Sequence, residues 1–359
     1  MATRTLTAES ATRIPPRPWW ETWWCIALAL LLVAVPPLSA RVAPLVGSAR
    51  DGVIGLLVAA LAPALGSQAV EKAIVIAIPV LAAAAMLWLS RTAHGRIQPS
   101  AYFALPFAVF HACPGEALAV ALALGAFAVW LRLAGWPQLR AAVFVMLSAL
   151  ICATHIIGWL CLLVMAFAAE HARERAVERD GVRRGQVACG WRAALACLPL
   201  APAVLIAPAW HPVGAADWLA SLPLKPGSLM MALRDHWPMF DAVCMIVVAL
   251  VLYKSHRDRR FVHAPMLVAA AVGLLLLFVA IPSGAAGPVA SCAIALALLS
   301  IRCNARVKLH RRGEVAWAAL AFLAIRTAAG TAGVTIDGTD SRELPAVSHP
   351  GLSHPATAR

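Results

Sequence analysis

AAVFVMLSALICATHIIGWLCLLVMAFAA, residues 141–169, is the stretch that decides the fold, and its only potentially charged side chain is His155. It is followed directly by EHARERAVERDGVRRGQVACGWR, residues 170–192, which is predicted to be a polar loop rich in arginine. An apolar run that ends in arginines is typical of a membrane span reaching the cytoplasmic face. As one helix, the run would be roughly 44 Å long at ~1.5 Å per residue, against a hydrocarbon core of about 30 Å.

The two basic segments that flank this run decide between one span and two. A single tilted helix would place Arg132 and Arg140 on one side of the membrane and the arginines of 170–192 on the other. The positive-inside bias disfavours that arrangement. Two shorter passes joined by an outer turn at residues 154–158 keep both basic segments in the cytoplasm. The sequence therefore predicts a hairpin of two spans, with His155 close to the turn.

The composition excludes an ordinary soluble protein. Of the 359 residues, 62% are hydrophobic and 13% are charged, and the mean hydropathy is +0.79. A soluble domain carries about 25% charged residues. The net charge of +13 comes from basic residues in short loops between apolar runs, which predicts membrane lipid rather than nucleic acid as the partner. The nine cysteines form no CxxC pair, so we expect neither a disulfide framework nor a metal site.

The whole chain is predicted to be all-α, a polytopic transmembrane helix bundle of about 11 spans in the bacterial inner (cytoplasmic) membrane. We expect residues 1–23 to be a cytoplasmic segment, residues 24–334 to be the transmembrane domain, and residues 335–359 to be a disordered extracytoplasmic tail. This places the N-terminus in the cytoplasm and the C-terminus outside. Every strongly basic loop then falls on one side, as the positive-inside rule requires.

The predicted spans follow the apolar runs. They are residues 24–40, 72–90, 99–111, 116–133, the two passes within 141–169, 191–210, 240–253, 264–281, 289–301 and 315–334. Residues 55–66 are apolar but short, which favours a re-entrant or interfacial helix and leaves a full crossing open. Residues 282–288, PSGAAGP, are predicted to be a tight outer turn, and residues 211–238 a long outer loop.

No phosphate-binding loop, dinucleotide fingerprint, zinc spacing or nucleophile elbow is present in a convincing context. The candidates for chemistry are therefore polar residues on the outer face and in the last span: Asp51, Glu116, His155, Arg234, Asp235 and Arg326. Each also has a structural interpretation. The carboxylates of Asp51 and Glu116 can be solvated or can cap a helix, and His155 can bond the backbone of its turn. Arg234 and Asp235 can form an ion pair, and Arg326 can snorkel to the interface.

Six segments carry a resemblance to a known group of proteins. They are residues 71–108 (EKAIVIAIPVLAAAAMLWLSRTAHGRIQPSAYFALPFA), 122–133 (LALGAFAVWLRL), 152–159 (CATHIIGW), 191–201 (WRAALACLPLA), 230–241 (MMALRDHWPMFD) and 324–330 (AIRTAAG). In this order they resemble bacterial multi-pass proteins laid out like GT-C-type membrane glycosyltransferases. The resemblance implies a GT-C-like helix bundle that transfers a sugar from a polyprenyl-phosphate donor in envelope glycan synthesis.

The same resemblance implies roles for the candidate residues. A carboxylate in the first outer loop serves the family as base or metal ligand, which points to Asp51 and, if the protein is active, to a divalent metal ion. Arg50, Arg234 and Arg326 would contact the donor phosphate, with Glu116, His155 and Asp235 as further substrate-binding groups. Compared with the family, this chain looks shortened in its first outer loop and after its last span.

A non-catalytic, degenerate member of the same fold, acting as a membrane scaffold or partner subunit, is the alternative. An enzyme should gather Asp51, Glu116, Arg234 and Asp235 around one site, whereas a scaffold should leave them dispersed.

Overall fold

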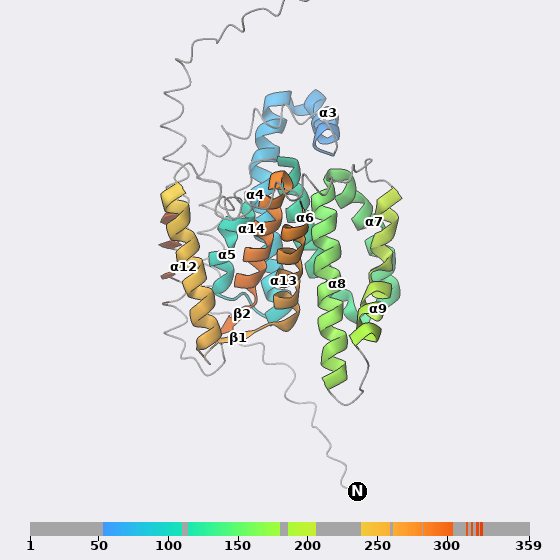
Figure 1. Cartoon of the computed structure of the whole chain (residues 1–359). Coiled ribbons are helices and arrows are strands. Elements are labelled where there is room, and N and C mark those ends of the chain that lie inside the picture. The colour runs from blue at the N-terminus through green and yellow to red at the C-terminus, as the bar shows by residue number, and fades with distance from the viewer. Residues whose placement is uncertain are drawn as a thin grey trace, which may run out of the picture.

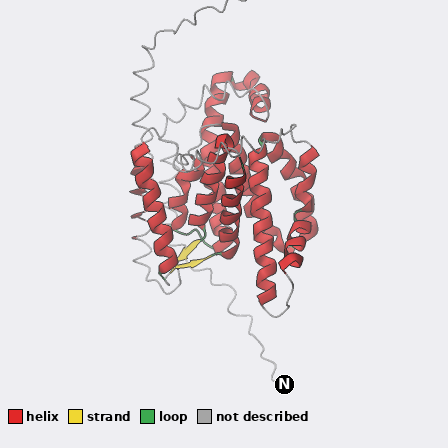
Figure 2. Cartoon of the chain, in the orientation of Figure 1, coloured by secondary structure: helices red, strands yellow, loops and turns green. Residues whose placement is uncertain are grey.

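The computed structural model describes residues 53–109, 114–179, 186–205, 238–258, 261–281 and 283–303, with seven further residues between 314 and 325. Nearly all of this is helix (Figure 2). In chain order the elements are α3 (Val53–Leu65), α4 (Ser67–His94), α5 (Ser100–Val109), α6 (Pro114–Arg132), the 3-10 helix η2 (Leu133–Gly135), α7 (Pro137–Thr154), α8 (Ile156–Arg179), α9 (Gln186–Ala196), the 3-10 helix η3 (Leu198–Leu205), α12 (Pro238–Arg257), β1 (Phe261–His263), α13 (Pro265–Ala280), α14 (Ser283–Leu299) and β2 (Ile301–Cys303).

The predicted hairpin is confirmed. Helices α7 and α8 are separated by His155 alone, whose backbone is extended with φ −169° and ψ 133°. Arg140 lies fifteen residues before this break and Glu170 fifteen residues after it (155 − 140 = 170 − 155), yet their side chains meet at 2.7 Å. Two helices of this length can bring such residues together only if the chain reverses direction at His155.

The arginine-rich segment after residue 169 was predicted to be a loop, and for its first ten residues that prediction is wrong. Helix α8 continues to Arg179. The residues EHARERAVER are mostly alanine, glutamate and arginine, which are among the best helix formers, and Arg173 pairs with Glu170 three residues earlier. Local propensity therefore extends the helix beyond its apolar part.

Four described helices are long and apolar enough to cross a membrane, or five if one bent pair counts as a span. The four are α4, α6, α7 and α8, which correspond to the predicted spans two, four, five and six. The bent pair is α9 and η3, which meet at 57°. The predicted span over 191–210 is therefore bent in its described part, where Pro199 and Pro202 interrupt regular α-helical hydrogen bonding.

Two of the remaining described helices are too short to cross a membrane alone. Helix α3 has 13 residues, about 20 Å, which favours the re-entrant or interfacial alternative for this segment. Helix α5 has 10 residues, about 15 Å, too short to cross a hydrocarbon core of about 30 Å by itself. Predicted span one lies outside the described residues, and so does most of span eleven.

Two local predictions around α14 are corrected. The tight turn expected at 282–288 is largely helix, because α14 begins at Ser283. The small residues of this segment are buried from Ala286 onward, so close packing outweighs their poor helix propensity. In addition, β1 and β2 form a two-stranded antiparallel ladder with Val262 opposite Arg302, an exception to the predicted all-α fold.

The core forms where α4, α5, α6, α8, α13 and α14 pack together (Figure 1). Its largest fully buried side chains include Trp130, Tyr102 and Phe127. Small residues allow close helix contacts: a Cβ atom on Gly158 of α8 would lie 2.6 Å from the Cβ atom of Ala119 on α6. This is the kind of packing expected where lipid replaces water around a bundle.

The described lysines and arginines gather at one end of the bundle, with Lys72 near the start of α4 as the exception. We call this the basic end; it contains Arg91, Arg96, Arg132, Arg140, Arg173, Arg175, Arg179, Arg192, Lys254, Arg257 and Arg302. In Figure 1 it is the lower end, marked by β1, β2 and the end of α8, while α3 lies at the upper end. The opposite end, called the α3 end, contains α3, the starts of α4 and α6, and the turn at His155.

Candidate functional site

Most of the predicted site residues lie outside the described part of the chain. These are Arg50, Asp51, Arg234, Asp235 and Arg326. Glu116 and His155 are described, and both lie at the α3 end. They come from elements in contact, because Ala119 of α6 packs directly against Gly158 of α8.

Glu116 is in the first turn of α6, where a carboxylate interacts favourably with the helix dipole. Its Oε2 atom is buried and has no hydrogen-bond partner within the described residues. A buried carboxylate oxygen without a donor is costly unless something else supplies one. The Glu116 carboxylate can therefore still accept a hydrogen bond or a proton from a bound molecule at the α3 end.

His155 has the structural role that was its alternative interpretation. Its Nδ1 atom accepts a hydrogen bond from the backbone N–H of Ile157 at 3.3 Å. Its own backbone N–H donates to the carbonyl of Ile151. These bonds hold the reversal between α7 and α8, and the imidazole makes no hydrogen bond to Glu116 within the described chain.

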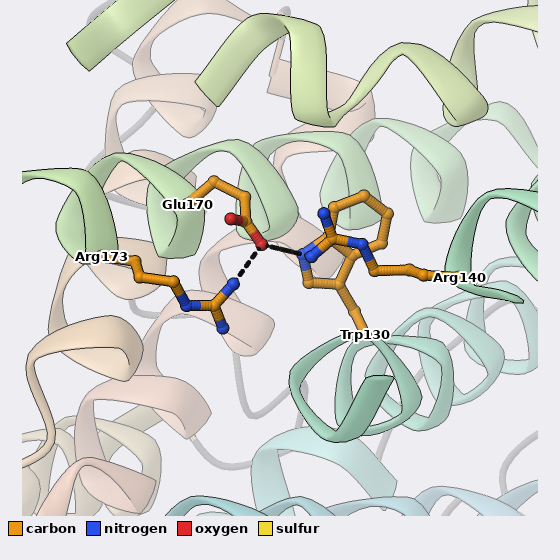
Figure 3. A network of polar contacts seen from close by, with 4 residues as sticks. All are labelled: Trp130, Arg140, Glu170 and Arg173. Carbon is orange, nitrogen blue, oxygen red and sulfur yellow. Dashed lines mark hydrogen bonds and ion pairs between the residues drawn. The ribbon is translucent and has the colours of Figure 1, made fainter. Parts of the chain in front are cut away.

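A buried ionic cluster at the basic end was not anticipated as a site (Figure 3). Its centre is Glu170 of α8, whose Oε1 atom accepts hydrogen bonds from Trp130 Nε1 at 2.9 Å, Arg140 Nη1 at 2.7 Å and Arg173 Nη1 at 2.7 Å. The guanidinium carbon of Arg140 also lies 4.3 Å from the Trp130 ring centre. The cluster thus joins α6, α7 and α8.

The electrostatics of this cluster are unbalanced. The side chain of Glu170 is 8% exposed and that of Arg140 is 10% exposed, while Arg173 is 26% exposed. Two guanidinium groups face one carboxylate, which leaves one excess positive charge in a largely dry position. A cation–π contact with Trp130 lowers the cost of burying Arg140, but it supplies no negative charge.

The sequence contained a signal that could have identified this cluster. Once the turn is placed at His155, residues at equal distances on either side must lie at the same level of the hairpin. Arg140 and Glu170 satisfy that condition and carry opposite charges. The arginines were interpreted only as markers of topology, so the pairing partner of Arg140 was missed.

A second polar cluster joins the ends of α4 and α14. His94 Nε2 donates to the backbone carbonyl of Leu299 at 2.7 Å, and the Ser100 hydroxyl donates to the carbonyl of Ile301 at 2.8 Å. The backbone N–H of Ala264 donates to the carbonyl of Ser300. The last carbonyls of a helix lack intrahelical donors, so these bonds complete the end of α14.

Within the described ranges, no three His, Cys, Asp or Glu side chains lie close enough together to hold a metal ion. No protein-family model, curated protein or solved structure matches the chain in the three comparisons with known proteins.

Proposed function

We propose that the chain is a multi-pass protein of the bacterial cytoplasmic membrane whose basic end faces the cytoplasm. The supporting observation is the segregation of cations: among the described residues, only Lys72 lies away from the basic end. Positive-inside bias then orients the α3 end toward the extracytoplasmic side. We propose the expected topology with it, in which the N-terminus is in the cytoplasm and the C-terminus is outside.

The orientation predicts opposite labelling at the two ends. In a background without the native cysteines, Ser67→Cys at the α3 end should react with a membrane-impermeant maleimide in intact spheroplasts. Arg175→Cys at the basic end should react only after permeabilisation. Both positions are exposed, so accessibility of the side chain does not separate them. Labelling of Arg175→Cys in intact spheroplasts would contradict the orientation.

We further propose that the protein is a GT-C-like glycosyltransferase acting at the α3 end on a polyprenyl-phosphate sugar. The observation that carries this proposal is the Oε2 atom of Glu116, which is buried and has no hydrogen-bond partner among the described residues. An acceptor hydroxyl must lose a proton as it attacks the sugar. Cations near the departing phosphate stabilise its charge, the role proposed for Arg50, Arg234 and Arg326.

In this proposal Asp51 is the base or a ligand of a divalent metal ion, and Glu116 positions the acceptor or shares the proton. His155 and Asp235 remain further substrate contacts, although the imidazole of His155 already bonds its own turn. The sugar donor carries phosphate charge, so a metal ion at Asp51 would offset that charge near the reacting carbon.

The test is a glycan-transfer assay in membranes supplied with labelled polyprenyl-phosphate sugars. Asp51→Asn should lower product formation by a factor of about 10²–10⁴, the usual contribution of a general base. Glu116→Gln should lower it at unchanged expression. The matched control is Glu71→Gln, which removes a carboxylate at the same end of the bundle but from α4. Equal, nonzero product from the wild type and Asp51→Asn would remove Asp51 as the base.

The second candidate is a non-catalytic scaffold or partner subunit of the same fold. It is favoured by the use of buried charge in this bundle: Glu170 is occupied by three donors and joins three helices. A carboxylate bound in this way stabilises the packing of the helices and does not take part in a reaction. Absence of product from the wild type in the same assay, with the protein correctly inserted, would favour the scaffold.

A further inference from the structure

The ionic cluster at the basic end carries an excess cation that the described chain does not neutralise. Arg140 and Arg173 both donate to one atom, Oε1 of Glu170. A guanidinium has five N–H donors, and each of these bonds uses the Nη1 nitrogen of its arginine. The arrangement therefore fixes two arginines next to each other. Their remaining N–H groups and one positive charge are not used by Glu170.

The surroundings of the cluster add positive charge. Arg175 is exposed one residue beyond Glu174, and Arg192 of α9 lies 3.8 Å from Glu174. The described ends of α6 to α9 contain six arginines and three glutamates: Arg132, Arg140, Arg173, Arg175, Arg179 and Arg192 against Glu170, Glu174 and Glu178. The cluster is thus a local maximum of positive charge and not a balanced network.

The position of the cluster indicates what could neutralise it. Glu170 directly follows the apolar part of α8, at the level where a span leaves the hydrocarbon. Trp130 lies at the same level, because its indole N–H donates to Glu170 from inside the core. Lipid phosphates lie at this depth, and basic sites between helices on the cytoplasmic side bind anionic head groups.

We propose that Arg173 and Arg140, held in place by Glu170, bind the phosphate of an anionic membrane phospholipid. The planar guanidinium fork matches phosphate oxygens and makes charge-assisted hydrogen bonds with them. Arg173 is the more exposed of the two arginines and makes the direct contact, with Arg140 behind it. The lipid supplies the negative charge that balances the cluster. This inference does not depend on glycosyltransferase activity.

Native mass spectrometry of the purified full chain, titrated with phosphatidylglycerol or phosphatidylcholine, tests the site. The wild type should bind phosphatidylglycerol more tightly than phosphatidylcholine. Arg173→Gln should weaken phosphatidylglycerol binding about tenfold or more, because charge-assisted hydrogen bonds are the strong ones. Arg175→Gln is the matched control, since it removes the same charge two residues away on the same helix, outside the cluster. Equal weakening by the two variants, or none by either, would overturn the proposal.

Two further arms settle the source of the phosphate and guard against a misfolded variant. Glycerol phosphate is titrated as a soluble competitor: failure to displace the lipid at matched concentration supports a lipid site, and displacement at equal affinity overturns it. A photoreactive phosphatidylglycerol is also crosslinked to the wild type. Labelled peptides from the start of α7 and the end of α8 support the proposal, whereas label spread evenly over all helices contradicts it.

Discussion

Glu170→Ala is expected to lower the free energy of unfolding by about 3–5 kcal/mol, the usual cost of breaking a buried ion pair by removing one partner. The carboxylate accepts hydrogen bonds from Trp130, Arg140 and Arg173 through a single atom. Without it, the guanidinium of Arg140 is left largely buried with no counter-charge in the described chain. Thermal unfolding in detergent micelles measures the loss, and a fall in the yield of inserted protein should accompany it.

The control for this prediction is Glu174→Ala. Glu174 is the same residue type on the same helix, but its side chain is 26% exposed and its ion pair with Arg192 is 3.8 Å long. Exposed pairs contribute about 0–1 kcal/mol, so this variant should unfold close to the wild type. Replacing Arg140 and Glu170 together by methionine and leucine should recover part of the loss, because apolar residues often substitute well for a buried pair. Similar losses in Glu170→Ala and Glu174→Ala would show that the cluster has no special role.

Gly158→Ala is expected to destabilise the bundle by about 1–3 kcal/mol, the usual cost of overpacking a tight contact, and Gly158→Leu by more. A Cβ atom at this position would lie 2.6 Å from the Cβ atom of Ala119 and 2.7 Å from its carbonyl oxygen. The carbonyl belongs to the backbone of α6, so relief requires α6 and α8 to separate. Separation would also lengthen the hydrogen bond from Trp130 to Glu170, which joins the same two helices.

Gly190→Ala is the matched control for the glycine contact. Gly190 is also helical, in α9, but a Cβ atom there meets nothing within 4 Å. Alanine is a better helix former than glycine by about 1 kcal/mol, so this variant should be neutral or more stable. If Gly158→Ala unfolds like Gly190→Ala, α6 and α8 do not approach as closely as the structure has them.

The hairpin at His155 could be predicted because it follows from quantities that a sequence contains. The length of the apolar run and the charges on its two sides disfavour a single span. The Glu170 cluster then follows from the hairpin, since Arg140 and Glu170 are equidistant from the turn.

The failures have a different origin, because they depend on contacts between segments distant in the chain. The bend between α9 and η3 is a separate case: its cause is local, but prolines alone do not specify where a helix breaks. The start of α14 at Ser283 requires burial of small residues that, taken alone, favour a turn. The pairing of β1 with β2 joins residues about forty positions apart and has no local signature.

At the candidate site, the sequence identified Glu116 and His155 correctly as polar groups at the same end of the bundle. The sequence did not show which of the two side chains already has a hydrogen-bond partner. His155 satisfies its ring through the adjacent backbone of Ile157, which its position in a turn makes natural. The burial of Glu116 Oε2 arises from the packing around the start of α6, which a hydropathy pattern does not contain.

The bond between His94 and Leu299 has a consequence for biosynthesis. The two residues are 205 positions apart, and chains are synthesised at about 5–20 residues per second. His94 is therefore synthesised roughly 10–40 s before Leu299, whose carbonyl accepts the hydrogen bond from its imidazole. During that interval the His94 ring and the Ser100 hydroxyl must be hydrated or held by another protein. The synthesis of α14 supplies the carbonyls that complete these hydrogen bonds at the basic end.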